Sequence, residues 1–283
     1  MAGSKVALVT GASSGIGRAT AEYLAARGYI VFGTARDPAR APAAAGVRFL
    51  PLDVRDDASV AACVAAVLGD AGRLDALVNN AGYTVTGAAE ETTIEQAKAL
   101  FETNVFGVLR VTNAVLPAMR RQASGTIANV SSVVGFLPAP YMGLYAATKH
   151  AIEGYSESLD HEVRTLGIRV RLIEPGFTRT GIDGSAVQAA NPLDAYDAQR
   201  RRVVAGIGAQ IAAAADPATV AAVVYRAIES TGPRLRFPVG REAAILRAVR
   251  RLVPAALFDK SLRKQFKLDA PRPDARGGRA APA

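Results

Sequence analysis

Short apolar runs alternate with segments of helical periodicity through the first 230 residues. Six runs are predicted to be strands: Lys5–Thr10, Tyr29–Thr34, Val47–Leu52, Ala76–Asn79, Thr126–Val130 and Ile168–Glu174. Helices are predicted between them, at Gly17–Arg27, Asp57–Leu68, Thr93–Met119 and Tyr145–Leu166. Strands that alternate with helices indicate an α/β fold whose parallel sheet is covered on both faces.

The pattern changes twice towards the C-terminus. A polar, Arg-rich stretch fills Thr180–Ala215, and Asp216 with Pro217 then predicts the start of a helix that ends near Ser230. We therefore expect one domain over residues 1–230 and an extension over residues 231–283. The last residues of the extension, PRPDARGGRAAPA, have the composition of a disordered tail.

Two basic amphipathic helices are predicted in the extension. Ile245, Val249, Leu252 and Val253 form one helical stripe, with Leu246 beside it, and a second stripe follows Pro254. The members of the second stripe are Phe258, Leu262 and Phe266. The favoured interpretation is that these stripes pack on the domain or on a sister subunit. The alternative is that the basic extension lies on an anionic membrane surface.

Composition narrows the functional class. The net charge is +9, and residues 231–283 hold the whole excess, with 13 Lys/Arg against 4 Asp/Glu. The domain itself is neutral, which argues against a nucleic-acid partner. No apolar run is long enough to span a membrane, and the chain does not open on a signal peptide. Cys63 is the single cysteine, and neither it nor His150 and His161 belongs to a metal-binding pattern, so we expect a metal-free cytoplasmic protein.

A glycine-rich turn, TGASSGIG, joins the first predicted strand to the first helix. Gly11, Gly15 and Gly17 permit a tight turn, a close approach of pyrophosphate and close packing of helix on strand. The amino end of the helix adds N–H groups and a partial positive charge. This spacing directly after the first strand predicts a dinucleotide site.

The end of the second strand indicates which dinucleotide binds. NAD sites usually place an acid there for the ribose 2′-hydroxyl, whereas Ala35 and Arg36 stand here. A guanidinium suits a 2′-phosphate, so NADP(H) is favoured over NAD(H). Asp37 follows directly and leaves two alternatives open, a contact with a ribose or an ion pair with Arg36.

Tyr145 and Lys149 lie one helical turn apart in the segment YAATK. Tyrosine titrates near pH ~10, and a nearby ammonium favours its ionised form. Ser132 follows the fifth predicted strand and can hydrogen-bond a substrate oxygen. The spacing to Tyr145 favours Ser132 over Ser131 for this role. Tyr141 and Met142 are expected to line the substrate pocket.

With these motifs in order, the chain resembles the short-chain dehydrogenase/reductase family over roughly residues 5–230. The matching segments are TGASSGIG, NNAG at Asn79–Gly82, NVFG headed by Asn104, Ser132, YAATK and PGFTRT at Pro175–Thr180. The resemblance implies a doubly wound Rossmann fold, with a parallel sheet of about seven strands and helices on both faces. It also implies a homodimer or homotetramer.

The resemblance further implies the role of each site residue. Tyr145 is the general acid/base, Lys149 lowers its pKa and holds the nicotinamide ribose, Ser132 orients the substrate oxygen, and Asn104 anchors a proton-relaying water. Asp53 is assigned to the adenine, Asn80, Ala81 and Gly82 to the adenosine side, and Thr178 and Thr180 to the carboxamide. The complete predicted cofactor set is Gly11, Ser13, Ser14, Gly15, Ile16, Gly17, Arg36, Asp53, Val54, Asn80, Ala81, Gly82, Tyr145, Lys149, Pro175, Gly176, Thr178 and Thr180.

The expected reaction is hydride transfer between a nicotinamide and an alcohol or carbonyl. The segments Pro138–Met142 and Tyr145–Gly154 look like the branch of 17-beta-hydroxysteroid and retinol dehydrogenases, which implies a lipophilic substrate. We also expect Gly181–Gln210 to close over the pocket as a lid. Two rival interpretations are a non-catalytic NADP-sensing protein on the same fold and a protein that acts at membrane surfaces through its extension.

Overall fold

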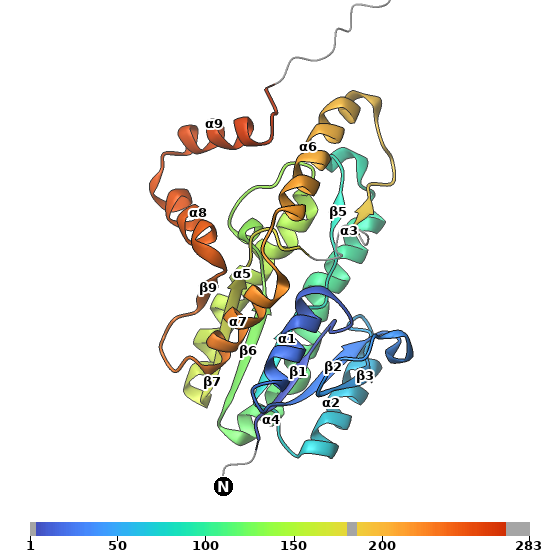
Figure 1. Ribbon diagram of the computed structural model, residues 1–283, viewed down its shortest axis with the longest axis vertical. Coiled ribbons are helices and arrows are strands. Elements are labelled where there is room, and N and C mark those ends of the chain that lie inside the picture. The colour runs from blue at the N-terminus through green and yellow to red at the C-terminus, as the bar shows by residue number, and fades with distance from the viewer. Residues whose placement is uncertain (1–3, 180–185, 270–283) are drawn as a thin grey trace, which may run out of the picture.

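The computed structural model describes residues 4–179 and 186–269 and contains one seven-stranded parallel sheet (Figure 1). The strand order is β3-β2-β1-β4-β6-β7-β9. The strands are β1 (Val6–Val9), β2 (Ile30–Ala35), β3 (Val47–Pro51), β4 (Ala76–Asn79), β6 (Gly125–Val130), β7 (Ile168–Glu174) and β9 (Arg236–Pro238). The order reverses between β1 and β4, which is where ligands bind in open sheets of this kind.

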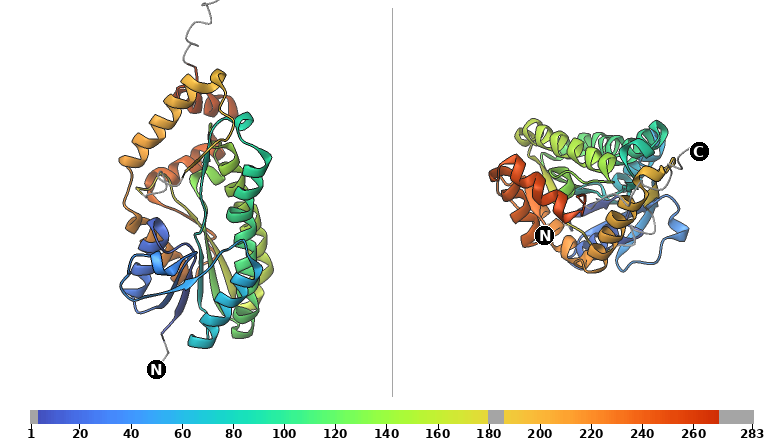
Figure 2. Two further views of the ribbon diagram at one scale, coloured as in Figure 1. Left: turned by 90° about the vertical axis from the view of Figure 1, so that its right-hand side faces the viewer. Right: turned by 90° about the horizontal axis from the view of Figure 1, so that it is seen from above.

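Helices cover both faces of the sheet (Figure 2). One face carries α1 (Gly15–Ala25) and α7 (Pro217–Glu229), and the other carries α2 (Asp57–Ala71), α4 (Gly107–Gln122) and α5 (Gly143–Val163). Strand alternation supplies both cores: Val6 and Leu8 face α2, α4 and α5, while Ala7 and Val9 face α1 and α7. The predicted doubly wound fold is confirmed.

The remaining elements gather beyond the carboxyl ends of the strands, where they can shape a site (Figure 1). They are α3 (Ile94–Phe101), α6 (Asp194–Ala212), α8 (Gly240–Leu252), α9 (Ala255–Gln265) and the short strands β5 (Val85–Thr86) and β8 (Val187–Gln188). Single turns occur at η1 (Pro38–Arg40), η2 (Ala89–Glu91), η4 (Val133–Gly135) and η5 (Arg164–Leu166). Helix α6 occupies much of the stretch predicted as a polar lid, and residues 181–185 of that lid lie outside the described residues.

The long helix predicted at Thr93–Met119 is interrupted. Helix α3 gives way at Glu102–Phe106 to a π-helical turn (η3), and α4 follows it directly. Such wide turns occur often at functional sites. This one contains Asn104, whose side chain bonds to residues outside the helix.

The seventh strand comes from the part of the chain that follows residue 230. Strand β9 lies beyond Ser230 and pairs with β7 from Leu172 to Glu174, so the sheet draws on the range assigned to the extension. The fully buried Arg171 of β7 donates to the carbonyls of Ser230 and Arg234 and so holds the connection to β9. A three-residue strand with Arg and Pro at its ends has no apolar run to reveal it.

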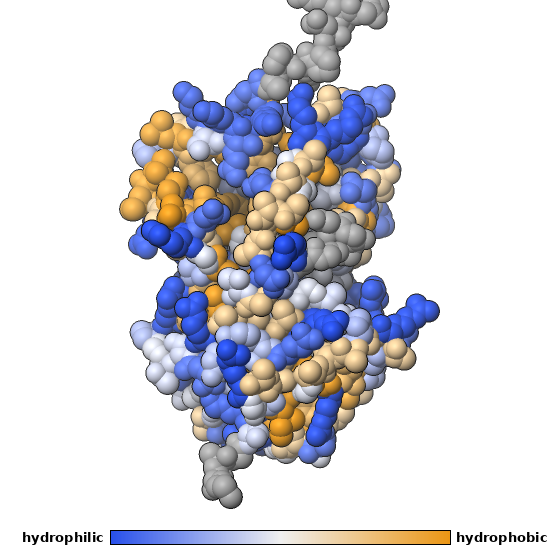
Figure 3. Space-filling view, in the orientation of Figure 1, coloured by the Kyte–Doolittle hydropathy of each residue, from blue (hydrophilic) through white to orange (hydrophobic). Residues whose placement is uncertain are grey.

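The prediction of which residues form the inner face of the first amphipathic helix is partly wrong. In α8, Leu246 and Val249 pack against the core while Ile245 and Leu252 are exposed. The buried position is Ala243, so the inner face is rotated relative to the predicted stripe. The second stripe is confirmed, because Phe258, Leu262 and Phe266 all contact apolar clusters. Hydrophobic side chains remain visible over α8 and α9 at the upper left of Figure 3.

The described helices include none with the length and apolar character needed to cross a bilayer.

Candidate active site

The glycine turn between β1 and α1 has the geometry of a phosphate cradle. Gly11 and Gly15 have φ values of 65° and 54°, a region that favours glycine. Gly17 is packed so tightly that a Cβ there would lie 2.2 Å from the Gly11 carbonyl oxygen. Ser14 precedes α1 without capping it through its side chain, so N–H groups of the first turn stay available to a ligand. These features fit a dinucleotide pyrophosphate.

Asn80 braces this turn from the neighbouring strand. Its Nδ2 donates to the carbonyls of Thr10 and Gly11 at 3.0 and 3.1 Å. The Thr10 hydroxyl accepts the backbone N–H groups of Asn80 and Ala81, each at 3.0 Å. The amide of Asn80 thus shapes the cradle, a use that the sequence pattern did not reveal.

The ends of β2 and β3 form the other wall of the cofactor region. Arg36 is exposed and makes no hydrogen bond or ion pair with the described residues. Asp37 is occupied: it accepts from the Ala39 backbone N–H at 3.1 Å and pairs with Arg40 at 3.4 Å. The alternative of an Arg36–Asp37 ion pair is therefore not what the structure contains.

Asp53 follows β3 and pairs with Arg55. The Arg55 guanidinium donates to both carboxylate oxygens, at 2.9 and 2.6 Å, and its hydrogen bonds lower the pKa of Asp53 to about 2. The positive charge of Arg36 adds to this lowering. Val54 is buried against Gly107 of α4. Arg55 was missed, because a polar residue after a strand carries no signal of its own.

Asn104 holds the loop after β4 against the helix that carries Tyr145. Its Oδ1 accepts from the Tyr83 backbone N–H at 3.0 Å, and its Nδ2 donates to the Tyr83 carbonyl at 2.9 Å and to the Thr148 hydroxyl at 3.3 Å. Gly82 leaves room for the Asn104 side chain, since a Cβ at this position would stand only 3.0 Å from Asn104 Oδ1. Asn104 thus reaches the residue next to Lys149, and Thr148 is a second contact that the sequence did not predict.

Ser132, Tyr145 and Lys149 come together at the carboxyl end of the sheet. Ser132 follows β6 directly, and its hydroxyl bonds to the Pro175 carbonyl and the Val134 backbone N–H, both at 3.3 Å. Lys149 Nζ donates to the Val130 carbonyl at 2.7 Å and lies 5.6 Å from the centre of the Tyr145 ring. The predicted trio is therefore brought into one site.

Burial shifts the pKa values of the two titratable residues of this trio, Tyr145 and Lys149. It raises the pKa of Tyr145 to about 12, against the opposing influence of the Ser132 hydroxyl. It lowers the pKa of Lys149 to about 8, against the opposing influence of Glu153. The predicted lowering of the Tyr145 pKa by Lys149 is not found here: desolvation of the phenol is the largest influence, and the opposing one comes from Ser132.

The rejected alternative Ser131 and the residues predicted after β7 remain to be placed. Ser131 is buried with its hydroxyl unpaired among the described residues, and it stands outside the trio. Pro175 and Gly176 follow β7, and the buried Thr178 donates to the Gly176 carbonyl at 3.4 Å. Thr180 lies outside the described residues.

The described part of the chain contains no cluster of His, Cys, Asp or Glu that could hold a metal ion.

Comparison with known proteins identifies this arrangement. The family model for short chain dehydrogenase matches residues 5–191. An uncharacterized oxidoreductase of Bacillus subtilis, YusZ, is 36% identical over 93% of this chain and 98% of its own length. A 3-ketodihydrosphingosine reductase of Bacteroides thetaiotaomicron is 44% identical, over 62% of this chain and 65% of that protein.

Two solved structures share the fold. A short-chain dehydrogenase of Streptomyces avermitilis has a TM-score of 0.77 and 37% identity, covering 95% of this chain and 98% of its own. A short-chain dehydrogenase/reductase of Burkholderia phymatum in complex with NAD has a TM-score of 0.75 and 30% identity, covering 92% and 95%. The chain belongs to the short-chain dehydrogenase/reductase family. It is an oxidoreductase that interconverts CH–OH and carbonyl groups with NAD(P).

Proposed function

We propose that this protein is an NADP(H)-dependent reductase of ketones or aldehydes, running also in the alcohol-oxidising direction, with Tyr145 as its general acid/base. The observation that carries the proposal is the meeting of Ser132, Tyr145 and Lys149 beside the glycine cradle. The presence of all three also argues against a purely NADP-sensing protein.

The chain's own residues manage the proton. Tyr145 is protonated at neutral pH and stands ready to donate its proton to a carbonyl oxygen as that oxygen becomes an alkoxide. Ser132 donates a hydrogen bond to the same oxygen and fixes its place. Lys149 supplies the positive charge that favours the phenolate left behind, and Asn104 holds the helix and loop that frame them. A bound nicotinamide dinucleotide supplies or accepts the hydride.

The unpaired guanidinium at the end of β2 supports the proposed NADP(H) preference. Arg36 is exposed and unpaired among the described residues, while the neighbouring Asp37 is occupied by Arg40 and the turn η1. A 2′-phosphate would find a cation at this position and no competing carboxylate free to take the ribose.

A substrate panel tests the function and the cofactor preference together. Aliphatic, aromatic and steroid ketones are offered with NADPH or NADH, and absorbance of the reduced cofactor is followed. We expect turnover with NADPH favoured. Arg36→Ala should lower kcat/KM for NADPH about tenfold or more and leave that for NADH nearly unchanged, because a charged hydrogen bond contributes about 1.5–3 kcal/mol.

The matched control is Arg48→Ala, which removes an exposed cation of β3 that pairs with Asp70. It should leave the NADPH to NADH ratio unchanged. Equal efficiency of both cofactors with the wild type would contradict the NADP(H) preference, and oxidation of neither cofactor with any carbonyl would contradict the proposed reaction.

The proposal extends to a lipophilic substrate and a homo-oligomer. An apolar cluster formed by α6 and the extension, including Val203, Ile207 and Phe266, packs beside Tyr145. On another surface, Ile94 and Phe106 are exposed beside Phe101 at the junction of α3 and η3, as suits contact with another subunit. A cytoplasmic location, membrane contact through the extension and closure by the lid stay predictions.

A further inference from the structure

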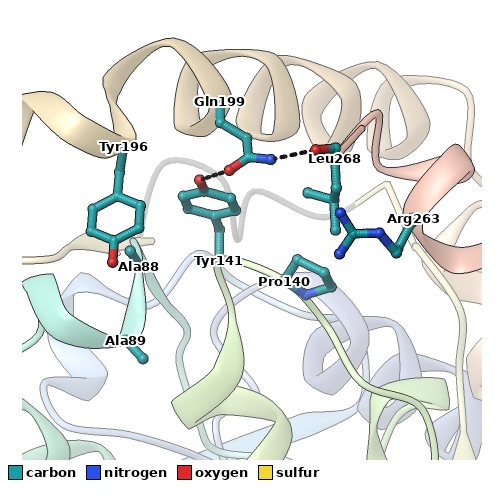
Figure 4. A pocket seen from close by; sticks show the side chains of 8 residues that line it. All are labelled: Ala88, Ala89, Pro140, Tyr141, Tyr196, Gln199, Arg263 and Leu268. Atoms are coloured by element: carbon teal, nitrogen blue, oxygen red, sulfur yellow. Dashed lines mark hydrogen bonds between the residues drawn. The ribbon is translucent and has the colours of Figure 1, made fainter. Parts of the chain in front are cut away.

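A pocket of about 380 Å³ lies between α6 and the end of the extension (Figure 4). Its floor comes from Ala88, Ala89 and Pro140. Helix α6 contributes Tyr196 and Gln199, and the extension contributes Arg263 and Leu268. The volume falls within the range of small-molecule sites.

This pocket adjoins the candidate active site. Tyr141 lines it and stands four residues before Tyr145, and both side chains pack on the same apolar cluster. Phe266 and Leu268 pack on that cluster as well. The end of the extension therefore lines this pocket and shares one apolar cluster with Tyr145.

A chain of hydrogen bonds fixes this wall. The backbone of Tyr141 has a φ of 62°, unusual for a residue other than glycine, and its carbonyl accepts the Gly87 N–H at 2.9 Å. Its hydroxyl donates to Gln199 Oε1 at 2.8 Å, and Gln199 Nε2 donates to the Leu268 carbonyl at 3.0 Å. Figure 4 shows the two side-chain bonds as a continuous link from the active-site loop through α6 to the extension.

The lining combines apolar and polar side chains, and among the described residues it carries a single charge. The polar groups of Tyr141 and Gln199 are used by this link, and the Tyr196 hydroxyl donates to Glu90 at 2.7 Å. Among the described residues that line the pocket, Arg263 alone carries a charge, and it extends its guanidinium toward Pro140 and Leu268 (Figure 4). Its partner is Asp269, in an exposed pair with side chains 46% and 59% accessible. Exposed pairs of this kind are weak, so a better-placed anion can displace Asp269.

We propose that this pocket is the outer part of the substrate site and binds the anionic end of an elongated apolar carbonyl compound, with Arg263 recognising the negative charge. The inference rests on the proposed function for the identity of the reacting group. A carboxylate or a phosphate monoester provides the same chemistry, since a guanidinium donates paired hydrogen bonds to either. The apolar body of the substrate then spans from Arg263 past Tyr141 to Tyr145.

Direct binding tests the site without turnover. Calorimetry on the full chain with NADP⁺ present measures binding of dodecanoate, dodecyl phosphate and the uncharged dodecan-1-ol. Arg263→Ala should weaken the preferred anion about tenfold and leave dodecan-1-ol unchanged, whereas the adjacent exposed Lys264→Ala should change neither. Preference for dodecanoate or for dodecyl phosphate tells which anion the site takes. Ala89→Trp, which fills the floor and keeps every charge, should weaken anion and alcohol alike.

Turnover supplies the second readout. Chain-length series of ω-1 keto acids and their methyl esters are reduced by the wild type and by Arg263→Ala. The ratio of kcat/KM for acid over ester should fall about tenfold in the variant. The proposal for the anion site is overturned if this ratio is unchanged, or if anion binding does not depend on Arg263. Reduction of the methyl esters would still support the proposed reaction in that case. Arg263-dependent binding without reduction of any ketone supports the site and contradicts the function instead.

Discussion

At the residue scale, Lys149 illustrates how a functional group opposes stability. Its ammonium is nearly buried, and desolvation lowers its pKa from 10.5 to about 8. The folded state therefore holds a charge that water would hold more favourably, at a cost on the order of 3 kcal/mol. The hydrogen bond to the Val130 carbonyl recovers part of that cost.

Lys149→Met should unfold at a higher temperature than the wild type at pH 7 while losing activity. The free energy of unfolding should rise by only about 1–2 kcal/mol, because the variant also leaves the Val130 carbonyl without its hydrogen-bond donor. The gain should shrink as the pH rises from about 8 to 10.5. In that window the unfolded wild type binds a proton that the folded wild type releases, so wild-type stability rises with pH.

Thermal denaturation of both proteins across this pH range measures the effect, with Lys98→Met as a matched surface control. A variant that is less stable than the wild type at pH 7, or a stability difference that does not depend on pH, would contradict the account of Lys149.

At the element scale, an ion pair adds to the apolar contacts that hold α8 against the end of β7. Arg247 Nη1 lies 2.5 Å from Glu174 Oε1, and its guanidinium stands 5.1 Å from the centre of the Phe136 ring. Glu174 ends β7 and is fully buried. Burial and the neighbouring Glu153 raise the pKa of Glu174 to about 7, against the opposing effects of Arg247 and Arg236. The docking of α8 therefore depends on a carboxylate that titrates near neutrality.

Arg247→Ala should loosen α8 and lower stability by about 1–2 kcal/mol at pH 8. This is less than the ~3–5 kcal/mol of a fully buried pair, since the Arg247 side chain is 36% exposed and Arg236 remains nearby. The loss should be smaller at pH 5.5, where a protonated Glu174 needs no cation. Hydrogen exchange in residues 240–252 provides the local measurement.

The exposed Arg251→Ala serves as the control and should exchange like the wild type. Unchanged protection of α8 in Arg247→Ala at pH 8 would show that apolar contacts through Leu246 and Val249 hold the helix by themselves.

At the scale of the whole molecule, the sequence predicted what depends on local periodicity and on spacing. Six strands, the crossover helices and the trio of Ser132, Tyr145 and Lys149 all follow from runs, turns and fixed offsets along the chain. The parallel arrangement of strands then brings their carboxyl ends to one edge, and this makes the site predictable once the order of elements is known.

What the sequence could not give depends on partners distant in the chain. Strand β9 exists because β7 offers it an edge, and the inner face of α8 is fixed by Glu174 and η4 rather than by its own periodicity. The π-helical turn at Asn104 requires contacts with Tyr83 and Thr148. The raised pKa of Tyr145 reflects three-dimensional burial, which no motif records.

If the Tyr145 hydroxyl carries the proton of the reaction, Tyr145→Phe should remove the proton transfer and leave the cofactor site in place. The variant keeps the ring and its apolar contacts with α6 and the extension, so NADPH binding measured by calorimetry should stay close to that of the wild type. With a ketone that the wild type reduces, kcat should fall about 10²–10⁴-fold, the usual contribution of a general acid/base. A Tyr145→Phe variant that binds NADPH and retains near wild-type kcat would show that another group transfers the proton.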